Sequence, residues 1–163
     1  MADYFTNVSI EAVLPKNAIR YAMEMYELSN DFAWEGESIE GAVLEGTLNE
    51  DLARDVLLLV SGGGGGALDT EIETDGRRLS LYSQGNADID FIIDLLQLTL
   101  KFFDLDDVVS FEWAYDCSKP RADAFGGGAA IVTKDECITM NTWEWLEKEL
   151  KQLVKEEKSH DNI

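Results

Sequence analysis

The chain has 163 residues, and 33 acidic side chains against 13 basic ones give it a formal net charge of −20. This charge argues against free nucleic acid and anionic membrane as direct partners, because phosphate groups would be repelled. No apolar run approaches the roughly 20 residues that cross a bilayer, and the first residues form no basic leader. We therefore expect a cytoplasmic protein with one domain at 1–157 and a polar tail at 158–163.

Cysteine and histidine are too scarce for several kinds of chemistry. Cys117 and Cys137 are the only thiols, and His160 is the only histidine. Two cysteines make no disulfide framework, and their spacing to His160 matches no zinc site. We expect two free, buried thiols, although the sequence leaves open whether they lie close together. It predicts no catalytic residue, no metal ligand set and no cofactor.

Hydrophobic periodicity predicts alternating strands and helices in the first half of the chain. The expected elements are a strand at 5–14, a helix at about 16–29, an acidic connection at 30–41, a short strand around 42–48 and a helix from the Asn49 cap to about Val60. The apolar run 56–60 fits a buried strand as an alternative. Ser61 and Gly62–Gly66 then read as a flexible connector.

A β-hairpin at 68–83 is the clearest local prediction. Asp75-Gly76 is a two-residue turn signature. A turn centred there pairs Ile72 with Leu79 on the inner face and Glu73 with Arg78 on the outer face.

The second half of the chain predicts further strands and two more helices. The expected elements are a helix at about 87–103 capped by Asn86, a strand at about 107–115, a loop at 117–128, a hairpin at about 129–140 turning at Lys134-Asp135, and a helix capped by Asn141 or Thr142 and running to about 156. Trp143, Leu146, Leu150 and Leu153 form the apolar side of the last helix and are expected to face inward. The order β-α-(β)-α-β-β-α-β-β-α predicts an α+β fold, a mostly antiparallel sheet with helices packed on one face.

Neither glycine run has the sequence of a phosphate-binding loop. Ala67-Leu68-Asp69 follows the first run, where a P-loop needs Lys-Ser/Thr. The second run lies close to two cations in an otherwise acidic chain, so backbone N–H groups and cations together could bind an anion. The residues of this candidate anion site are Lys119, Arg121, Gly126, Gly127 and Gly128. Anchoring of the loop to nearby carboxylates is the alternative.

The distribution of acids suggests a surface built to meet a basic partner. Alternate residues on a strand lie about 6.6 Å apart, close to the spacing of phosphates along a nucleic-acid strand. The expected partner-binding acids are Asp69, Glu71, Glu73 and Asp75 in the hairpin, and Glu35, Glu37 and Glu40 in the acidic connection. Solubility alone is the competing explanation.

Residues 111–130 (FEWAYDCSKPRADAFGGGAA), together with 140–146 (MNTWEWL), resemble uncharacterised acidic proteins of phages and conjugative elements. The resemblance covers about the last third of the chain. It implies a small non-catalytic accessory protein, such as an anti-defence factor, and it assigns no site residue.

These observations favour a non-enzymatic acidic interaction protein. A nucleic-acid mimic of this kind would block the cationic site of a nucleic-acid-binding protein or nuclease. The alternatives are an immunity protein that neutralises a basic toxin, and a small enzyme or anion-binding module using the Lys119–Gly128 loop. The oligomeric state is open.

Overall fold

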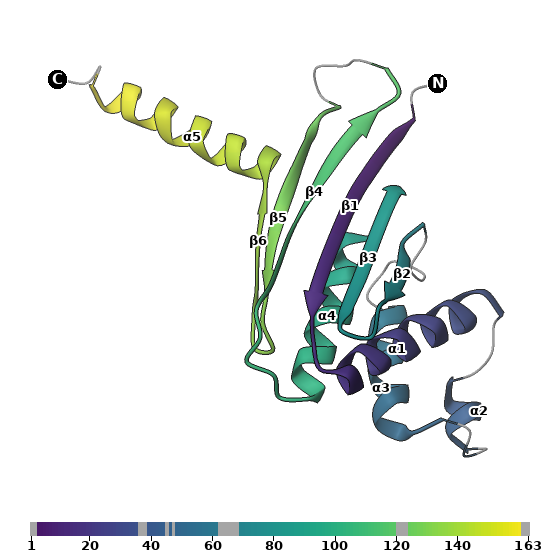
Figure 1. The fold of residues 1–163 in the computed structure, drawn as a ribbon. Helices are drawn as coiled ribbons and strands as arrows, with labels where there is room; N and C mark the ends of the chain where they lie inside the picture. Colours follow the sequence, from purple (N-terminus) through teal and green to yellow (C-terminus); the bar gives the residue numbers. More distant parts are fainter. Residues whose placement is uncertain are drawn as a thin grey trace.

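The computed structural model describes residues 3–35, 39–44, 46, 48–61, 69–119 and 124–160. Its strands form one antiparallel sheet in the order β2-β3-β1-β4-β5-β6 (Figure 1). The strands are β1 (Tyr4–Val13), β2 (Glu71–Thr74), β3 (Arg78–Gly85), β4 (Val109–Cys117), β5 (Gly126–Val132) and β6 (Cys137–Asn141). The helices are α1 (Lys16–Glu35), α2 (Ile39–Leu44), α3 (Glu50–Ser61), α4 (Ile89–Phe102) and α5 (Thr142–His160).

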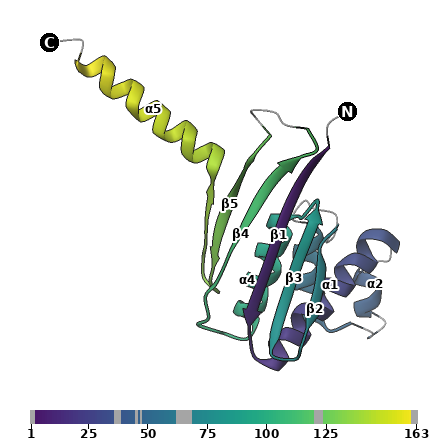
Figure 2. The same ribbon diagram turned by 45° about the horizontal axis from the view of Figure 1, so that its top comes forward.

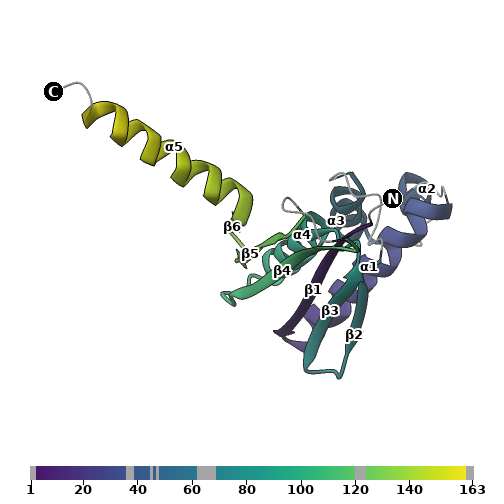
Figure 3. The same ribbon diagram turned by 90° about the horizontal axis from the view of Figure 1, so that it is seen from above.

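The fold class is confirmed as α+β. Helices α1, α3 and α4 cover one face of the sheet (Figure 3), and the core lies between these two layers. The connections β1-α1-β2 and β3-α4-β4 interleave, because β3 lies between β1 and β2 and β1 lies between β3 and β4. This is a βαββαβ arrangement, which the β5–β6 hairpin extends at one side. None of the described helices is long and apolar enough to cross a membrane.

Strand β1 is central because its alternation matches the two layers. Val8, Ile10 and Ala12 are buried under the helices, whereas Ser9 and Glu11 lie on the bare face. The same alternation in β3 and β4 leaves the second face of the sheet polar and uncovered.

The predicted strand around 42–48 is wrong, since α2 occupies the first part of this segment. Ile39 and Val43 are four residues apart and half-buried, which is helical spacing on the side that packs near α3. Helix α1 also continues past the expected end at residue 29, to Glu35. Helix α3 forms as predicted, with the Asn49 side chain accepting a hydrogen bond from the Asp51 N–H at 2.8 Å, so the alternative strand at 56–60 is wrong too.

The hairpin forms, but its register differs from the prediction by two residues. Ile72 pairs with Leu81 rather than Leu79, and Glu73 pairs with Ser80 rather than Arg78. Asp75 causes the shift, because its carboxylate accepts the N–H groups of Arg77 and Arg78, each at 2.8 Å, and widens the turn. A shift of two residues keeps every side chain on its predicted face.

Helix α4 begins two residues later than expected, and its N-cap is Asp88 rather than Asn86. The Asp88 carboxylate accepts the Phe91 N–H at 3.0 Å. Asn86 instead bridges to β1 through Thr6 and donates to the Asp69 carboxylate at 3.0 Å. The Asp88 side chain therefore stabilises the start of α4, whereas the Asn86 side chain ties the end of β3 to Asp69, which precedes β2.

The second glycine run is a strand and not a loop. Gly126–Gly128 begin β5, paired with β4 through Tyr115, Ala114 and Trp113. A Cβ atom on Gly128 would overlap the Trp113 ring and the Met140 carbonyl oxygen. The predicted loop at 117–128 is therefore shorter, and these glycines make room for an indole ring.

Helix α5 does not pack inward as predicted. It leaves the end of β6 and runs away from the sheet and from the other helices (Figure 2). Trp143, Leu146, Leu150 and Leu153 are all exposed. Periodicity identifies the apolar side of a helix but not what covers it, which explains the wrong prediction. The helix also continues to His160, into the expected polar tail.

Both cysteines are free; Cys117 is buried as predicted, whereas Cys137, on the edge strand β6, is only half-buried. The register of the sheet separates the two cysteines. Cys137 pairs with Val132, which pairs with Val109 at the start of β4. Cys117 ends β4, so the two thiols lie at opposite ends of the strands, roughly 25 Å apart.

We predict that Gly128→Ala destabilises the protein by about 1–3 kcal/mol, because the new methyl group must displace Trp113 or the β6 backbone. Gly85→Ala is the matched control, since its Cβ would make only ordinary contacts, at 3.7 Å from Asp69. Urea unfolding should show a lower midpoint for Gly128→Ala alone at an unchanged slope. Equal midpoints for the two variants would show that Trp113 does not need the glycine.

Candidate functional site

The predicted acidic row on the hairpin does not form an even ladder. Only Glu71 and Glu73 lie in β2, and Tyr82 donates to both carboxylates, at 2.8 and 2.9 Å. These hydrogen bonds to Glu71 and Glu73 raise the pKa of Tyr82 well above its usual range. Asp69 precedes the strand with a φ of 57°, and Asp75 lies in the turn. The spacing expected of a regular strand therefore applies to two of the four acids.

The other predicted site residues are only partly described. Glu37 and Arg121 lie outside the described residues, as do the side chains of Glu35 and Glu40. Lys119 is exposed just after β4, while the glycines expected beside it belong to β5. The glycines of the candidate anion site are therefore part of the sheet and not of a loop beside Lys119.

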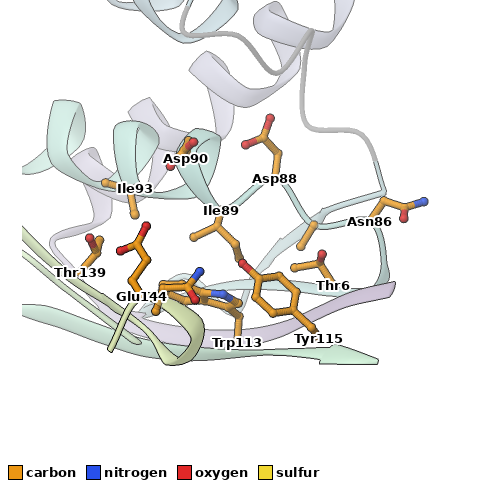
Figure 4. Close-up of a pocket in the computed structure, with 12 residues that line it drawn as sticks. Thr6, Asn86, Asp88, Ile89, Asp90, Ile93, Trp113, Tyr115, Thr139 and Glu144 are labelled. Carbon is orange, nitrogen blue, oxygen red and sulfur yellow. The ribbon is translucent and has the colours of Figure 1, made fainter. Parts of the chain in front are cut away.

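The structure brings together a groove that the sequence did not predict. It has a volume of about 620 Å³ and lies between the first turn of α4, strands β4 and β6, and the first turn of α5 (Figure 4). Trp113 and Tyr115 form its floor on the sheet, and Ile89 and Ile93 form an apolar wall on α4. The polar lining residues are Thr6, Asn86, Asp88, Asp90, Thr139, Asn141 and Glu144.

The glycines of β5 position the aromatic floor. Trp143 stacks on Tyr115 with ring centroids 5.0 Å apart and donates its indole N–H to the Phe125 carbonyl at 3.2 Å. A Cβ atom on Gly126 would lie 3.1 Å from the indole nitrogen of Trp143. The Thr142 hydroxyl accepts the Gly127 N–H at 3.0 Å, which holds the start of α5 against β5. Small residues in β5 therefore set where Glu144 enters the groove.

The carboxylates around the groove have no cationic partner among the residues that the structure describes. No ion pair within the described part of the chain includes Asp88, Asp90 or Glu144. Nearby on α4, burial raises the pKa of Asp94 above its usual value, and the charges of Asp90 and Asp88 raise it further. The groove is thus a region of concentrated negative potential.

This arrangement suits a cationic group. Carboxylates form charge-assisted hydrogen bonds with ammonium or guanidinium groups, and aromatic faces attract the same cations. A helix N-terminus favours negative charge, but Asp88 and Asp90 already supply that charge at the start of α4. A bound anion would be repelled by these two carboxylates. Of the twelve described residues lining the groove, none is a serine, cysteine, histidine or lysine.

The Trp113 indole nitrogen is a further feature of the groove floor. Trp113 is 8% exposed, and its N–H has no hydrogen-bond acceptor among the described residues. A buried donor without an acceptor costs free energy, and such groups need an explanation. Trp113 and Glu144 were not predicted site residues, because the sequence does not show that β4 and α5 meet at one groove.

Among the described residues, no group of three or more histidine, cysteine, aspartate or glutamate side chains could hold a metal ion. Comparison of the chain with protein-family models, curated proteins and solved structures gives no match.

We predict that Asp94→Asn stabilises the protein at neutral pH. The folded-state pKa of Asp94 is raised, so the stability linked to its proton is fully present below the unfolded pKa and is lost as the pH rises through the folded value. The Asn variant keeps a neutral group at every pH. Its Tm should exceed that of the wild type by roughly 1–2 °C at pH 7, and the difference should vanish near pH 3.

Asp107→Asn is the control, because it removes one charge from an exposed position outside this carboxylate group. A similar rise in Tm for both variants at pH 7 would mean that the lower net charge of the protein is responsible, and not the burial of Asp94 or its nearness to Asp88 and Asp90.

Proposed function

We propose that this protein is a non-enzymatic acidic interaction protein that binds the cationic site of a nucleic-acid-binding protein or nuclease and blocks it. The observation that carries this proposal is the groove, whose lining combines the carboxylates of Asp88, Asp90 and Glu144 with the rings of Trp113 and Tyr115. In this proposal the groove receives an arginine or lysine side chain of the partner.

The chemistry of the groove supports an inserted cation more than a simple soluble surface. A solubilising carboxylate needs only water, whereas Asp90 and Glu144 line the same groove as Trp113 and Tyr115. Aromatic rings and desolvated ion pairs at the centre of an interface commonly dominate binding energy. A carbonyl oxygen of the partner, after a small movement of the side chains above Trp113, would also satisfy the unpaired indole N–H.

The bare face of the sheet, opposite the face that carries the groove, offers a second acidic area. Glu112 and Asp116 on β4 are exposed there, and no ion pair within the described residues includes them. At the β2 edge, Tyr82 holds the carboxylates of Glu71 and Glu73 next to each other. Several anionic positions across one surface could match several cations of a nucleic-acid site.

The net charge of −20 would act before contact is made. Opposite charges steer a basic partner toward the acidic surface and speed association, and salt weakens this effect. Specificity would come from the groove, because contact there requires a cation with the right reach.

We predict that Asp90→Asn with Glu144→Gln weakens binding of the basic partner roughly 10-fold, because two carboxylates near the inserted cation lose their charge. Glu24→Gln with Glu27→Gln is the matched control, as it removes two exposed charges from α1 instead. Each protein is immobilised, exposed to nuclease-treated lysate of the source organism, and eluted with a salt gradient. The retained protein is then tested for displacement of duplex DNA.

Three results together would support the proposal. The control variant retains a DNA-binding protein or nuclease, and the groove variant releases the same protein at lower salt. The wild-type protein also displaces duplex DNA from it. Equal retention by both variants would show that binding follows net charge alone and would remove the groove from the proposal. A retained protein that keeps its DNA would contradict blocking, and a retained toxin would favour the immunity protein.

A further inference from the structure

Helix α5 exposes an apolar stripe that the described elements cover only at its first residue, where Trp143 stacks on Tyr115. Its residues are spaced by three and four positions and are 47–60% exposed, although each is large and apolar. They are Trp143, Leu146, Leu150 and Leu153. An amphipathic helix gains most of its stability by packing this side against a neighbour, so the stripe indicates an interface.

The strand that leads into α5 is an unprotected sheet edge. Strand β6 is the last strand of the sheet and reads Cys-Ile-Thr-Met-Asn, without charge or proline. Ile138 and Met140 on this strand are 57% and 49% exposed. The opposite edge, β2, carries Glu71 and Glu73, the kind of charge that prevents pairing with another chain. The two edges of the sheet therefore differ in their readiness to pair.

Charge points to a second copy of this chain as the molecule that covers this surface. Thr142–His160 has four lysines against five glutamates, whereas the rest of the chain has a net charge of −19. Two copies repel each other at almost any other surface, but not at β6 and α5. A basic partner would be attracted to the acidic remainder of the chain and not to the nearly neutral β6 and α5.

The shape of the molecule reduces the remaining repulsion. Helix α5 has 19 residues and runs outward beyond the β6 edge (Figures 1 and 2), so a chain placed beside β6 lies within its reach. If two β6 edges pair, the β5 and β6 strands of both copies separate the two β4 strands by five strand spacings, or roughly 24 Å. This separation exceeds the Debye length of about 8 Å at physiological salt, so much of each acidic body is screened from the other.

We propose that β6 and α5 form a two-fold interface with a second copy of this chain. The β6 edges pair antiparallel about an axis at Thr139, the middle residue of the strand, which places Ile138 of one copy opposite Met140 of the other. The α5 stripe then packs on the second copy.

The exposed apolar surface is sufficient for such a dimer. Half-exposed side chains of this size contribute roughly 80–100 Å² each. Seven such side chains on β6 and α5 give on the order of 600 Å² per copy, against about 800 Å² for a standard interface. They are Ile138, Met140, Trp143, Trp145, Leu146, Leu150 and Leu153. The β6 backbone and the flanking side chains supply the remainder.

Sedimentation equilibrium of the full chain tests this proposal. The wild type should have twice the 18.2 kDa mass of one chain, and its dimer should tighten several-fold between about 50 and 500 mM NaCl, because salt screens the repulsion between the two bodies. Binding to a basic partner has the opposite salt dependence, so this result is separable from the proposed function.

Two variants and one control locate the interface. Leu146→Glu with Leu150→Glu, and separately Ile138→Lys with Met140→Lys, should each give a monomer. The two variants change net charge in opposite directions, so net charge cannot explain a loss in both. Leu57→Glu with Leu58→Glu adds the same charge at equally exposed positions on α3 and should leave the dimer intact.

A wild-type monomer at both salt concentrations would overturn the proposal, as would a dimer that survives either substitution at β6 or α5. Circular dichroism of each variant should show an unchanged fold, because all four substituted side chains lie outside the buried core.

Discussion

The packing of Trp113 across the glycines of β5 is the contact on which much of this structure depends. Trp113 pairs with Gly128, and its ring occupies space that any other side chain at this position would need. The indole ring packs against the next strand and makes a broad apolar floor. It fits there because Gly128 has no Cβ atom, and close packing instead of a hydrogen bond keeps it in place. The Trp113 ring forms part of the groove floor, while the neighbouring Gly126 and Gly127 make room for Trp143 and hold the start of α5.

The charge of the chain is the second constraint, and the fold distributes it unevenly. Few acids form ion pairs within the described part. Lys134 pairs with Asp104 and Asp106, and Arg54 pairs with Asp51 and Asp55. Two single pairs, Arg78 with Glu11 and Lys151 with Glu147, add to these. Most of the remaining carboxylates face solvent, so repulsion among them opposes folding and must be offset by the core. Asp55 is the exception inside the protein, where it accepts a hydrogen bond from the Tyr21 hydroxyl at 2.9 Å. A protein that keeps so many unpaired acids at some cost in stability is well suited to a basic partner.

The groove and the α5 surface differ in chemistry. The groove combines carboxylates with aromatic rings, which fits a cation, whereas β6 and α5 are nearly neutral and apolar. They adjoin at the first turn of α5, where Trp143 and Glu144 are neighbours in sequence. A second copy bound at β6 would therefore lie next to the groove, and two grooves in one assembly could engage a partner with two-fold symmetry.

The sequence determined those features that depend on neighbouring residues. Alternation in β1, the cap at Asn49, the turn at Lys134-Asp135 and the α+β class are all local or depend on composition, and the structure confirms them. The amphipathic character of α5 was also local, but whether Leu146 is buried depends on what lies opposite, and only the tertiary structure shows that nothing described does.

Tertiary structure also decided the hairpin register and the candidate site. The Asp75 carboxylate accepts hydrogen bonds from two backbone N–H groups, and this local contact competes with the two-residue turn and moves it. The glycines at 126–128 looked like a loop because glycine disfavours strands, yet the ring of Trp113 on the paired strand made them necessary there. The groove joins residues from β1, α4, β4, β6 and α5. No local pattern encodes such a meeting, because it arises only when the sheet brings distant strands side by side.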